Sequence, residues 1–368
     1  MSVTVYSRAV RVLFASTQGA GHFGPLIPLL EAARSKGHET LVVGPPTLKS
    51  RGYPFRAGAT PPDEVLGPLW ASMPSLPPGQ GDVVVVGEIF ARLNVDAMLP
   101  TLEETIEEWR PDLVVREASE FASAIAADVH GVRHVRVAIG VSFVEAAALG
   151  LAEPALDERR AGVAERIAAS PYLTYYPQSV DPPPFPVTRL RHPGVDAQGG
   201  PLPDWWPGDE RPLVYASFGS VAATFPPAAQ VYASLLDAVA GLPVRVLLTT
   251  GGNEIELGDV PPNVHVEPWV SEPEVLAHAS AMVGHGGSGT TLSAIAAGCP
   301  LVSVPLFGDQ PMNAARVAAA GAGVVATVTG IRRAVERVLE HERYGATARL
   351  IADEMRAHAP VDSFLDAV

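Results

Sequence analysis

The fold of this chain follows from the stretch Val283-Gly-His-Gly-Gly-Ser-Gly-Thr-Thr-Leu292 and, after it, Pro305-Leu-Phe-Gly-Asp-Gln-Pro-Met-Asn313. In the first stretch an apolar strand runs into a turn of small residues, and the pattern predicts a helix that begins at Ser288. The N–H groups at the start of a helix have no partner within the helix and carry partial positive charge, so they favour an anion. The two stretches together predict a receptor for a diphosphate with a polar group beyond it.

The residues of the first stretch are also suited to binding a diphosphate. Gly287 and Gly289 carry no Cβ that would keep phosphate oxygens away. Ser288 and Thr290 add hydroxyl donors, and His285 can donate a ring N–H. The alternative interpretation is a glycine-rich turn between a strand and an ordinary capped helix.

Apolar strands alternate with helical patterns along the rest of the chain. The first series contains Val10–Ser16, Leu26–Lys36, Glu39–Gly44 and Ile89–Trp109, and a second series begins at Leu213–Phe218. Such alternation is typical of parallel sheets with crossover helices. We therefore predict an α/β chain of two doubly wound, Rossmann-like domains, 1–195 and 213–368. Residues 196–212, rich in Gly, Pro and Trp, are the predicted linker.

Composition agrees with two domains and excludes several classes of protein. The 368 residues, 47% of them hydrophobic, supply two cores. A formal charge of −14 argues against a nucleic-acid partner. Cys299 is the only cysteine and the sequence contains no Asp-x-Asp, so we expect no disulfide framework and no metal site. No apolar run approaches the ~20 residues of a membrane span and no signal peptide is evident, so we expect a cytoplasmic protein without a membrane partner.

A second glycine motif, Gly19-Ala-Gly-His-Phe-Gly24, follows the first strand and suggests a rival function. It matches the GxGxxG of nicotinamide dehydrogenases. A dehydrogenase of that kind needs an acidic residue at the end of the second strand to bind a ribose 2′-OH. That strand ends Leu41-Val-Val-Gly-Pro-Pro, without an acid, so the motif does not favour a dinucleotide.

The box His285-Gly-Gly-x-Gly-Thr with Asp309-Gln310 resembles the donor-binding site of inverting, family 1 glycosyltransferases. The likeness runs from Arg11 to Arg356 and is greatest to the actinobacterial enzymes that attach deoxysugars to antibiotics. The resemblance implies the GT-B fold, in which two Rossmann-like domains face a central cleft. It also implies that the last helix, here Tyr344–Ala357, crosses back to the N-terminal domain.

In this family a histidine after the first strand is the catalytic base, and the matching residue is His22. Imidazole titrates in the range that suits removal of a proton from an acceptor hydroxyl. A carboxylate that orients the ring improves such a base. Glu117, at the end of a strand, is the expected partner, although the family commonly carries Asp there, and Glu120 is the alternative.

The resemblance also implies the donor contacts. Asp309 and Gln310 match the pair that binds sugar hydroxyls, Trp269 matches the residue that stacks on the donor base, and the Val270 backbone reads the base edge. The predicted diphosphate contacts are Ser217, Gly219, Ser220, His285, Gly287, Ser288, Gly289 and Thr290. No metal is implied, because protein donors meet the charge of the leaving group.

The donor and the acceptor are less sharply defined. UDP-glucose enzymes of this family often carry Glu where this chain has Ser293, which favours a dTDP-deoxysugar as co-substrate and leaves a UDP-sugar as the alternative. We expect no other cofactor. The acceptor is expected to be a hydrophobic small-molecule aglycone that contacts Phe23, Trp70, Met73 and Phe143.

Two further functions remain as alternatives. An epimerase or hydrolase of nucleotide sugars would act on the donor without an acceptor. A non-catalytic helper of another transferase would typically lack the base, whereas His22 is present. The predicted function is antibiotic biosynthesis by an inverting glycosyltransferase, either a monomer or a homodimer.

Overall fold

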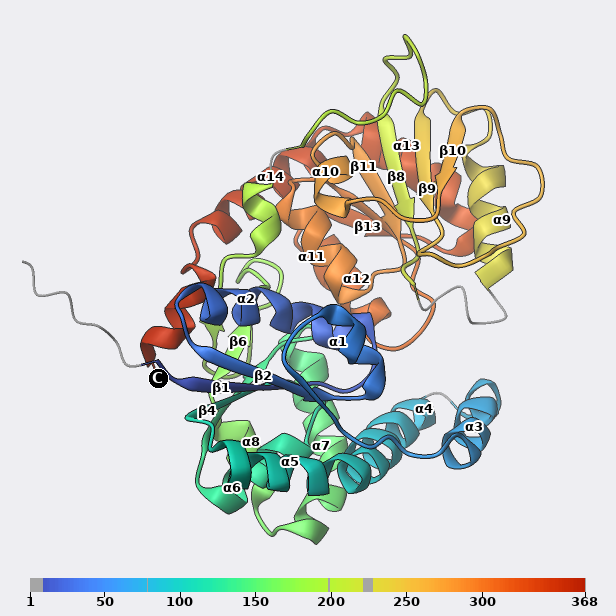
Figure 1. The fold of residues 1–368 in the computed structure, drawn as a ribbon. Coiled ribbons are helices and arrows are strands. Elements are labelled where there is room, and N and C mark those ends of the chain that lie inside the picture. The colour runs from blue at the N-terminus through green and yellow to red at the C-terminus, as the bar shows by residue number, and fades with distance from the viewer. Residues whose placement is uncertain (1–8, 78, 198, 221–227, 368) are drawn as a thin grey trace, which may run out of the picture. The chain divides into compact units, whose positions relative to one another are not determined.

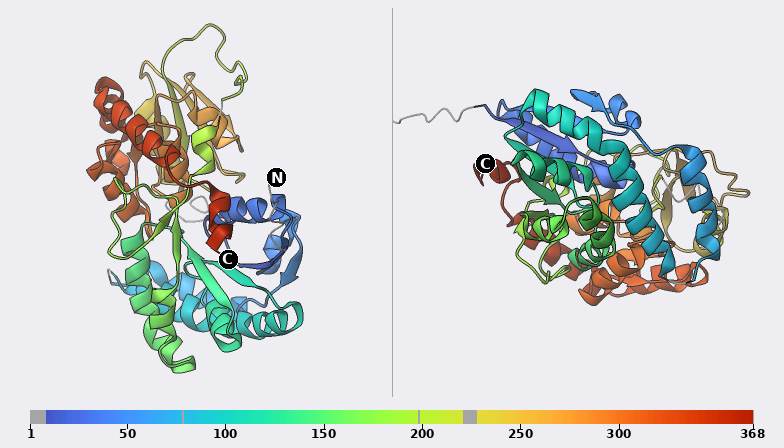
Figure 2. Two further views of the ribbon diagram at one scale, coloured as in Figure 1. Left: turned by 90° about the vertical axis from the view of Figure 1, so that its left-hand side faces the viewer. Right: turned by 90° about the horizontal axis from the view of Figure 1, so that it is seen from below.

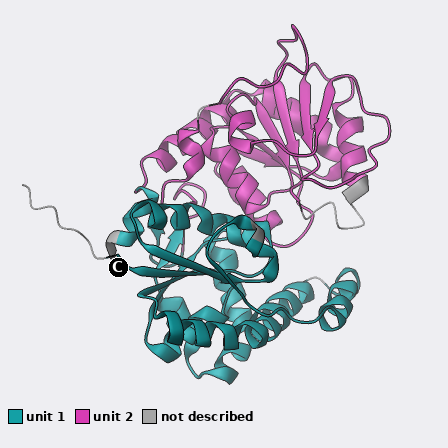
Figure 3. Cartoon of the chain, in the orientation of Figure 1, with its two compact units in different colours: residues 1–174, 184–188, 360–368 teal, residues 175–183, 189–359 magenta. Residues whose placement is uncertain are grey.

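The computed structural model describes residues 9–77, 79–197, 199–220 and 228–367, which are coloured in Figure 1. These residues form two compact units, shown in Figure 3. Unit 1 runs to Thr174 and includes 184–188 and the segment from Pro360; unit 2 contains 175–183 and 189–359. The chain thus passes between the units after Thr174 and again on both sides of 184–188, and the predicted linker 196–212 lies inside unit 2. One reason is local: the Tyr176 hydroxyl donates a hydrogen bond to Ser288 Oγ at 3.1 Å, which ties this segment to unit 2.

Unit 1 is built on a seven-stranded sheet with the strand order β3-β2-β1-β4-β5-β6-β7. All neighbouring strands from β3 to β6 are parallel. In β1 every residue after Arg11 is buried, and so is all of β4, as expected of apolar strands that are covered on both faces. The strands are β1 (Arg11–Ala15), β2 (Glu39–Gly44), β3 (Phe55–Ala57), β4 (Leu113–Glu117), β5 (Arg133–Val137), β6 (Tyr172–Thr174) and β7 (Thr188–Arg189).

Helices cover both faces of this sheet (Figures 1 and 2). The core on one face is formed by apolar residues such as Leu102, Ile106 and Ile125. The helix that carries Ile125 ends at Gly131, whose φ of 65° is left-handed and suits glycine. The helices are α1 (Ala20–Phe23), α2 (Ile27–Ser35), α3 (Asp63–Ser72), α4 (Gln80–Asp82), the π-helix Val83–Asn94, α5 (Val95–Trp109), α6 (Ala122–His130), α7 (Ser142–Arg159) and α8 (Val163–Ala169).

Unit 2 is built on a six-stranded sheet with the order β10-β9-β8-β11-β12-β13, and all its strands are parallel. Helix α9 packs with α13, and α11 packs with α14. The strands are β8 (Leu213–Ser217), β9 (Arg245–Thr249), β10 (Val264–Glu267), β11 (Ala281–Gly284), β12 (Leu301–Ser303) and β13 (Gly323–Val325). The helices are α9 (Ala228–Val239), α10 (Glu272–Leu276), α11 (Ser288–Ala296), α12 (Gln310–Ala319), α13 (Ile331–Glu340) and α14 (Arg343–Arg356).

Each sheet has one point where the strand order reverses, between β1 and β4 in unit 1 and between β8 and β11 in unit 2. Loops on the two sides of such a point diverge and leave a crevice beyond the carboxyl ends of the strands, where ligands bind in open α/β sheets. In unit 1 these ends carry His22 and Glu117. In unit 2 they carry the loop 217–220 and His285. The topology therefore places the predicted catalytic pair and the predicted donor turn at the expected positions of their sheets.

The C-terminal segment returns to unit 1. Helix α14 itself belongs to unit 2, whereas the segment from Pro360 belongs to unit 1 and packs on α2. Lys36 Nζ lies 3.1 Å from Asp362 Oδ2, and Phe364 and Leu365 are buried. The crossing expected of the last helix is thus made by the residues after it.

Within the described ranges, none of the helices combines the length and the apolar character that a bilayer crossing requires.

Candidate active site

Unit 1 brings a histidine and a glutamate together where its strand order reverses. His22 lies on α1, the short helix after β1, and Glu117 is the last residue of β4. Nδ1 of His22 is 3.1 Å from Oε1 of Glu117 and 3.0 Å from Oγ1 of Thr17. The expected contact between His22 and Glu117 is therefore present. Thr17, which no sequence motif marked, completes the cluster.

The hydrogen bonds fix which ring nitrogen of His22 carries a proton. The Thr17 hydroxyl donates to Oε1 of Glu117 at 2.6 Å, so Oγ1 of Thr17 accepts from the ring. A carboxylate is also an acceptor only. Nδ1 is therefore protonated, and in the neutral ring Nε2 carries the lone pair. The imidazole side chain is 22% exposed, which leaves this histidine within reach of a substrate.

Glu117 remains ionised although it is completely buried. Burial alone would raise its pKa, but the neighbouring His22, the Thr17 hydroxyl and the Ser119 N–H outweigh burial and hold the pKa of Glu117 below its ordinary value. The Ser119 N–H donates to Oε2 at 2.6 Å. Glu120, the alternative partner, accepts hydrogen bonds from the Ser123 backbone and hydroxyl, and burial raises its pKa to about 7. Glu117 is thus the carboxylate that orients His22.

A phenylalanine from the π-helix packs against the His22 ring. The ring centroids of Phe90 and His22 are 5.5 Å apart and the rings meet edge to face at 70°. Ile89 and Ala91 on either side are buried and anchor this turn. Stretches of π-helix are rare and occur frequently at functional sites. The sequence pattern predicted a single helix over Ile89–Trp109 and did not reveal this contact.

The residues predicted to bind the acceptor fall into two groups. Phe23 is only 1% exposed, so it is a core residue and does not line an acceptor surface, which corrects its predicted role. Successive residues of a helix point about 100° apart, and α1 turns His22 outward and Phe23 inward. Trp70 and Phe143 are 43% and 51% exposed, and Met73 is half-buried. These three side chains remain accessible to an apolar ligand.

In unit 2 the loop after β11 forms the predicted turn. β11 ends at Gly284, α11 begins at Ser288, and no side chain of the described residues caps the first turn of this helix. Its first N–H groups therefore point out of the helix without a capping partner. Gly286 has a φ of 83°, and a Cβ there would lie 3.0 Å from the Gln310 carbonyl oxygen. This turn requires glycine for both reasons.

His285 is held between two glycines. A Cβ on Gly287 would collide with Nε2 of His285, and one on Gly219 would lie 3.0 Å from Cε1 of the same ring. Burial lowers the pKa of His285 to about 4, and a hydrogen bond with the Ser217 backbone opposes this shift only partly. The ring is therefore neutral at neutral pH, and its single N–H donates to the Ser217 backbone. Its Nδ1 is buried and has no partner among the described residues.

The loop 217–220 after β8 lies beside His285 and is braced from the neighbouring strand. Gly219 has a φ of 73°, which suits glycine. The side-chain amide of Asn253 donates to the Ser220 carbonyl at 3.0 Å and to the Thr250 carbonyl at 3.1 Å. Asn253 thus joins the loops after β8 and β9, a role that no sequence motif predicted.

The acid–amide pair Asp309 and Gln310 lies at the start of α12. Asn313 donates to Oδ2 of Asp309 at 2.6 Å and to the Gly286 carbonyl at 3.1 Å, which links the pair to the predicted donor turn. Gln310 is 3% exposed, and its Oε1 accepts hydrogen bonds from two backbone N–H groups of the preceding loop, at 2.8 and 3.1 Å. Gln310 therefore braces the loop after β12, and Asp309 is the more accessible of the two.

Trp269 and Glu272 lie near the start of α10, in the region predicted to bind the donor base. Trp269 is 72% exposed, whereas Trp is mostly covered in folded proteins, so its ring face is available to a ligand. Val270 follows it directly. Glu272 accepts a hydrogen bond from Thr290 at 3.4 Å and one from Ser293. Burial raises the pKa of Glu272. The structure thus places an acid beside Ser293 that sequence motifs did not reveal.

Both parts of the chain match a known family. Residues 83–190 match the N-terminal domain, and residues 233–363 the C-terminal domain, of erythromycin biosynthesis protein CIII-like proteins. The elloramycin glycosyltransferase ElmGT of Streptomyces olivaceus is 30% identical over 382 residues, which cover 96% of this chain and 95% of that protein.

Solved structures show the same fold. The glycosyltransferase SnogD from Streptomyces nogalater superimposes with a TM-score of 0.78 at 26% identity over 98% of this chain and 100% of SnogD. The glycosyltransferase VinC, determined in complex with dTDP, has a TM-score of 0.72 at 22% identity over 97% of this chain and 98% of VinC. The predicted GT-B fold is confirmed. The chain belongs to the EryCIII-like family of actinobacterial antibiotic glycosyltransferases, and it is a family 1 glycosyltransferase.

Proposed function

We propose that this glycosyltransferase transfers a sugar from a dTDP-sugar to a hydroxyl group of a hydrophobic natural-product aglycone, with inversion at the anomeric carbon. His22 is the general base. The observation that carries this proposal is the hydrogen bonding of Nδ1 of His22 to Glu117 and Thr17, because it leaves Nε2 as a proton acceptor.

The transfer is a single displacement. Nε2 of His22 takes the proton of the acceptor hydroxyl while the hydroxyl oxygen forms a bond to the anomeric carbon. The bond from that carbon to the diphosphate oxygen breaks, and its electron pair leaves with dTDP. Attack from the side opposite the leaving group inverts the configuration. The carboxylate of Glu117 stabilises the imidazolium that forms.

The diphosphate charge is met by donors of unit 2. These are the N–H groups at the start of α11 and the hydroxyl of Ser288. Across the described part of the chain, no three His, Cys, Asp or Glu side chains are placed to hold a metal ion together. We therefore assign the stabilisation of the leaving group to the protein's own donors.

We expect sugar transfer to proceed at the same rate in buffer with excess EDTA, because those donors replace a divalent cation. The measurement is the rate of aglycone glycosylation before and after dialysis against EDTA, with magnesium added back as the control. A strict requirement for magnesium would contradict the metal-independent mechanism.

The region around Ser293 supports a deoxyribose. The carboxylate of Glu272 already accepts hydrogen bonds from Ser293 and Thr290, so part of its capacity to accept from a ribose 2′-OH is used. Thymidine has no 2′-OH to satisfy. The GT-B fold accommodates dTDP in VinC. These observations favour dTDP over UDP.

We expect Trp269→Ala to weaken dTDP binding about tenfold or more, because stacking of a base on an aromatic ring contributes ~1–3 kcal/mol. Calorimetric titration of dTDP measures the change. Trp269→Phe is the matched control, since it keeps an aromatic face and should retain most of the affinity. Equal affinity of wild type and Trp269→Ala would contradict the stacking role.

We expect Gly287→Ala to weaken dTDP binding about tenfold to a hundredfold, because the added Cβ collides with the His285 ring and displaces the donor turn at a strain of ~1–3 kcal/mol. Gly200→Ala is the control, since a Cβ there meets nothing within 4 Å. If both variants bind dTDP like the wild type, the turn is not the diphosphate site.

The acceptor is proposed to contact the accessible side chains of Trp70, Met73 and Phe143. The test of the proposed function is incubation of the full chain with a panel of dTDP-sugars and apolar polyketide aglycones. Mass spectrometry should detect the glycosylated aglycone and free dTDP, and NMR should show the opposite anomeric configuration in the product. Turnover with UDP-glucose alone, or release of free sugar without transfer, would replace the proposal by one of its alternatives.

A further inference from the structure

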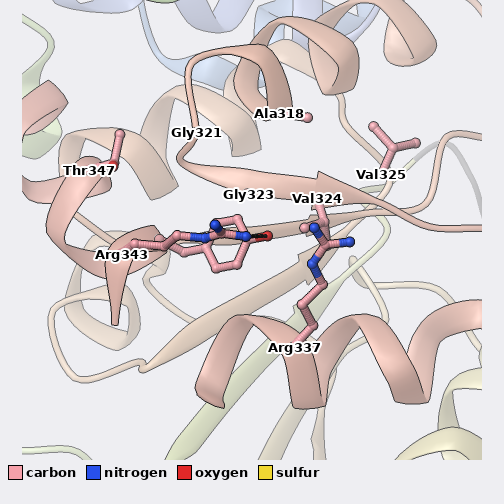
Figure 4. Close-up of a pocket in the computed structure, with 9 residues that line it drawn as sticks. Ala318, Gly321, Gly323, Val324, Val325, Arg337, Arg343 and Thr347 are labelled. Atoms are coloured by element: carbon pink, nitrogen blue, oxygen red, sulfur yellow. Dashed lines mark hydrogen bonds between the residues drawn. The ribbon is translucent and has the colours of Figure 1, made fainter. Parts of the chain in front are cut away.

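Unit 2 contains a cavity of about 510 Å³ beside the edge strand β13. The backbone of Gly323 and Val324 forms one wall, and α13 and α14 contribute the polar side chains of Arg337, Arg343, Tyr344 and Thr347 (Figure 4). None of the residues that line it belongs to the predicted donor site. The cavity is therefore a separate feature of the fold.

Two arginines converge on one oxygen in this cavity. Nη2 of Arg343 donates to the Tyr344 hydroxyl at 3.2 Å, and its guanidinium lies 4.9 Å from the centre of the Tyr344 ring. Arg337, from α13, lines the same cavity, and its charge acts on the same hydroxyl. Burial alone would raise the pKa of Tyr344, but the two arginines outweigh it and lower the pKa. Two positive charges thus lie close together around one phenolic oxygen.

No carboxylate of the described residues forms an ion pair with Arg337 or Arg343. The chain has 40 acidic residues against 26 basic ones, and other arginines, such as Arg56 and Arg160, do have acidic partners. Arg337 and Arg343 are exposed, and a bound anion would relieve what remains of their mutual repulsion. The arrangement is therefore complementary to an anion that the protein itself does not supply.

We propose that this cavity binds the phosphate group of a small molecule. Guanidinium groups bind phosphate oxygens through paired N–H donors. The hydroxyls of Tyr344 and Thr347 line the same cavity and add donors, and a phosphate has more acceptor oxygens than a carboxylate. The volume exceeds that of a phosphate group, so an organic part has room beside β13.

The test is equilibrium dialysis of radiolabelled inorganic phosphate against the full chain in buffered chloride. The wild type should bind phosphate saturably in the millimolar range or tighter. Arg337→Gln and Arg343→Gln should each weaken binding about tenfold, because each removes charge-assisted hydrogen bonds. Arg333→Gln, an exposed residue of the same helix outside the cavity, removes the same charge and should leave binding unchanged. Thermal melting of each variant checks that it is folded.

His285→Ala separates this site from the donor turn, and it should leave the phosphate affinity of the cavity unchanged. Competition identifies the ligand class: glucose 1-phosphate should displace phosphate, and acetate should not. The proposal is overturned if no saturable binding occurs or if Arg333→Gln weakens binding as much as Arg337→Gln. It is equally overturned if only His285→Ala weakens binding, or if acetate displaces phosphate as well as glucose 1-phosphate does.

Discussion

The His22→Ala variant is expected to lose about a hundredfold to ten-thousandfold in kcat, the contribution typical of a general base. Without the imidazole, no group takes the proton of the acceptor hydroxyl as the glycosidic bond forms. Binding of dTDP should stay close to that of the wild type, because the proposed donor contacts lie in unit 2 and His22 lies in unit 1. The measurements are the rate of aglycone glycosylation and the calorimetric Kd for dTDP.

His130→Ala serves as the control for His22→Ala, since it removes a histidine from α6 of the same unit. It should retain both turnover and dTDP binding. Two results would contradict the assigned role of His22: turnover retained in His22→Ala, or loss of dTDP binding together with turnover.

The Glu117→Gln variant is expected to lower kcat about a hundredfold or more, as loss of the orienting carboxylate does in serine proteases. A neutral amide stabilises the imidazolium less, and its NH2 group can donate to Nδ1, which would move the ring proton to Nε2. Nε2 then no longer accepts a proton. The steady-state rate of sugar transfer measures the effect.

Glu120→Gln is the matched control for Glu117→Gln. Glu120 is also buried and only three residues away, but it binds Ser123. Its replacement should leave kcat within a few-fold of the wild type, although it lowers the thermal stability. If Glu120→Gln and Glu117→Gln slow transfer equally, the loss reflects damage to the fold and not the orientation of His22.

The sequence was most informative where function depends on neighbours along the chain. A strand, a glycine turn and a helix start within Val283–Leu292 predict an anion site because the backbone donors are local, and the structure forms this turn. The alternation of strands and helices likewise predicted two parallel sheets. His22 follows β1 and Glu117 is the last residue of β4. The carboxyl ends of these neighbouring parallel strands lie at the same side of the sheet, so the proximity of the two residues was predictable from topology.

Contacts between distant segments were not predictable in this way. Phe90 meets His22 from the π-helix before α5, and no periodicity signalled that helix. Glu272 lies on α10 and hydrogen-bonds to Ser293 on α11. The sequence around Ser293 contains no acid, so this neighbour could not be predicted from it. Phe23 follows His22 directly in sequence, but the turn of α1 points it into the core.

The boundary between the two units also depends on contacts that the sequence does not reveal. Composition placed the linker at 196–212, where Gly, Pro and Trp interrupt both patterns. The chain first leaves unit 1 after β6, where the segment from Tyr175 packs with unit 2, returns to unit 1 for 184–188 and joins unit 2 again at Arg189. Composition reports where regular structure stops, whereas the boundary depends on which core a segment joins.

The most direct test of the central claim is a calorimetric comparison of dTDP, UDP and NADH binding to the purified full chain in EDTA. A dTDP-sugar transferase with metal-free donor contacts should bind dTDP most tightly, UDP more weakly and NADH not at all. Tighter binding of UDP than of dTDP, or binding of NADH alone, would contradict the account.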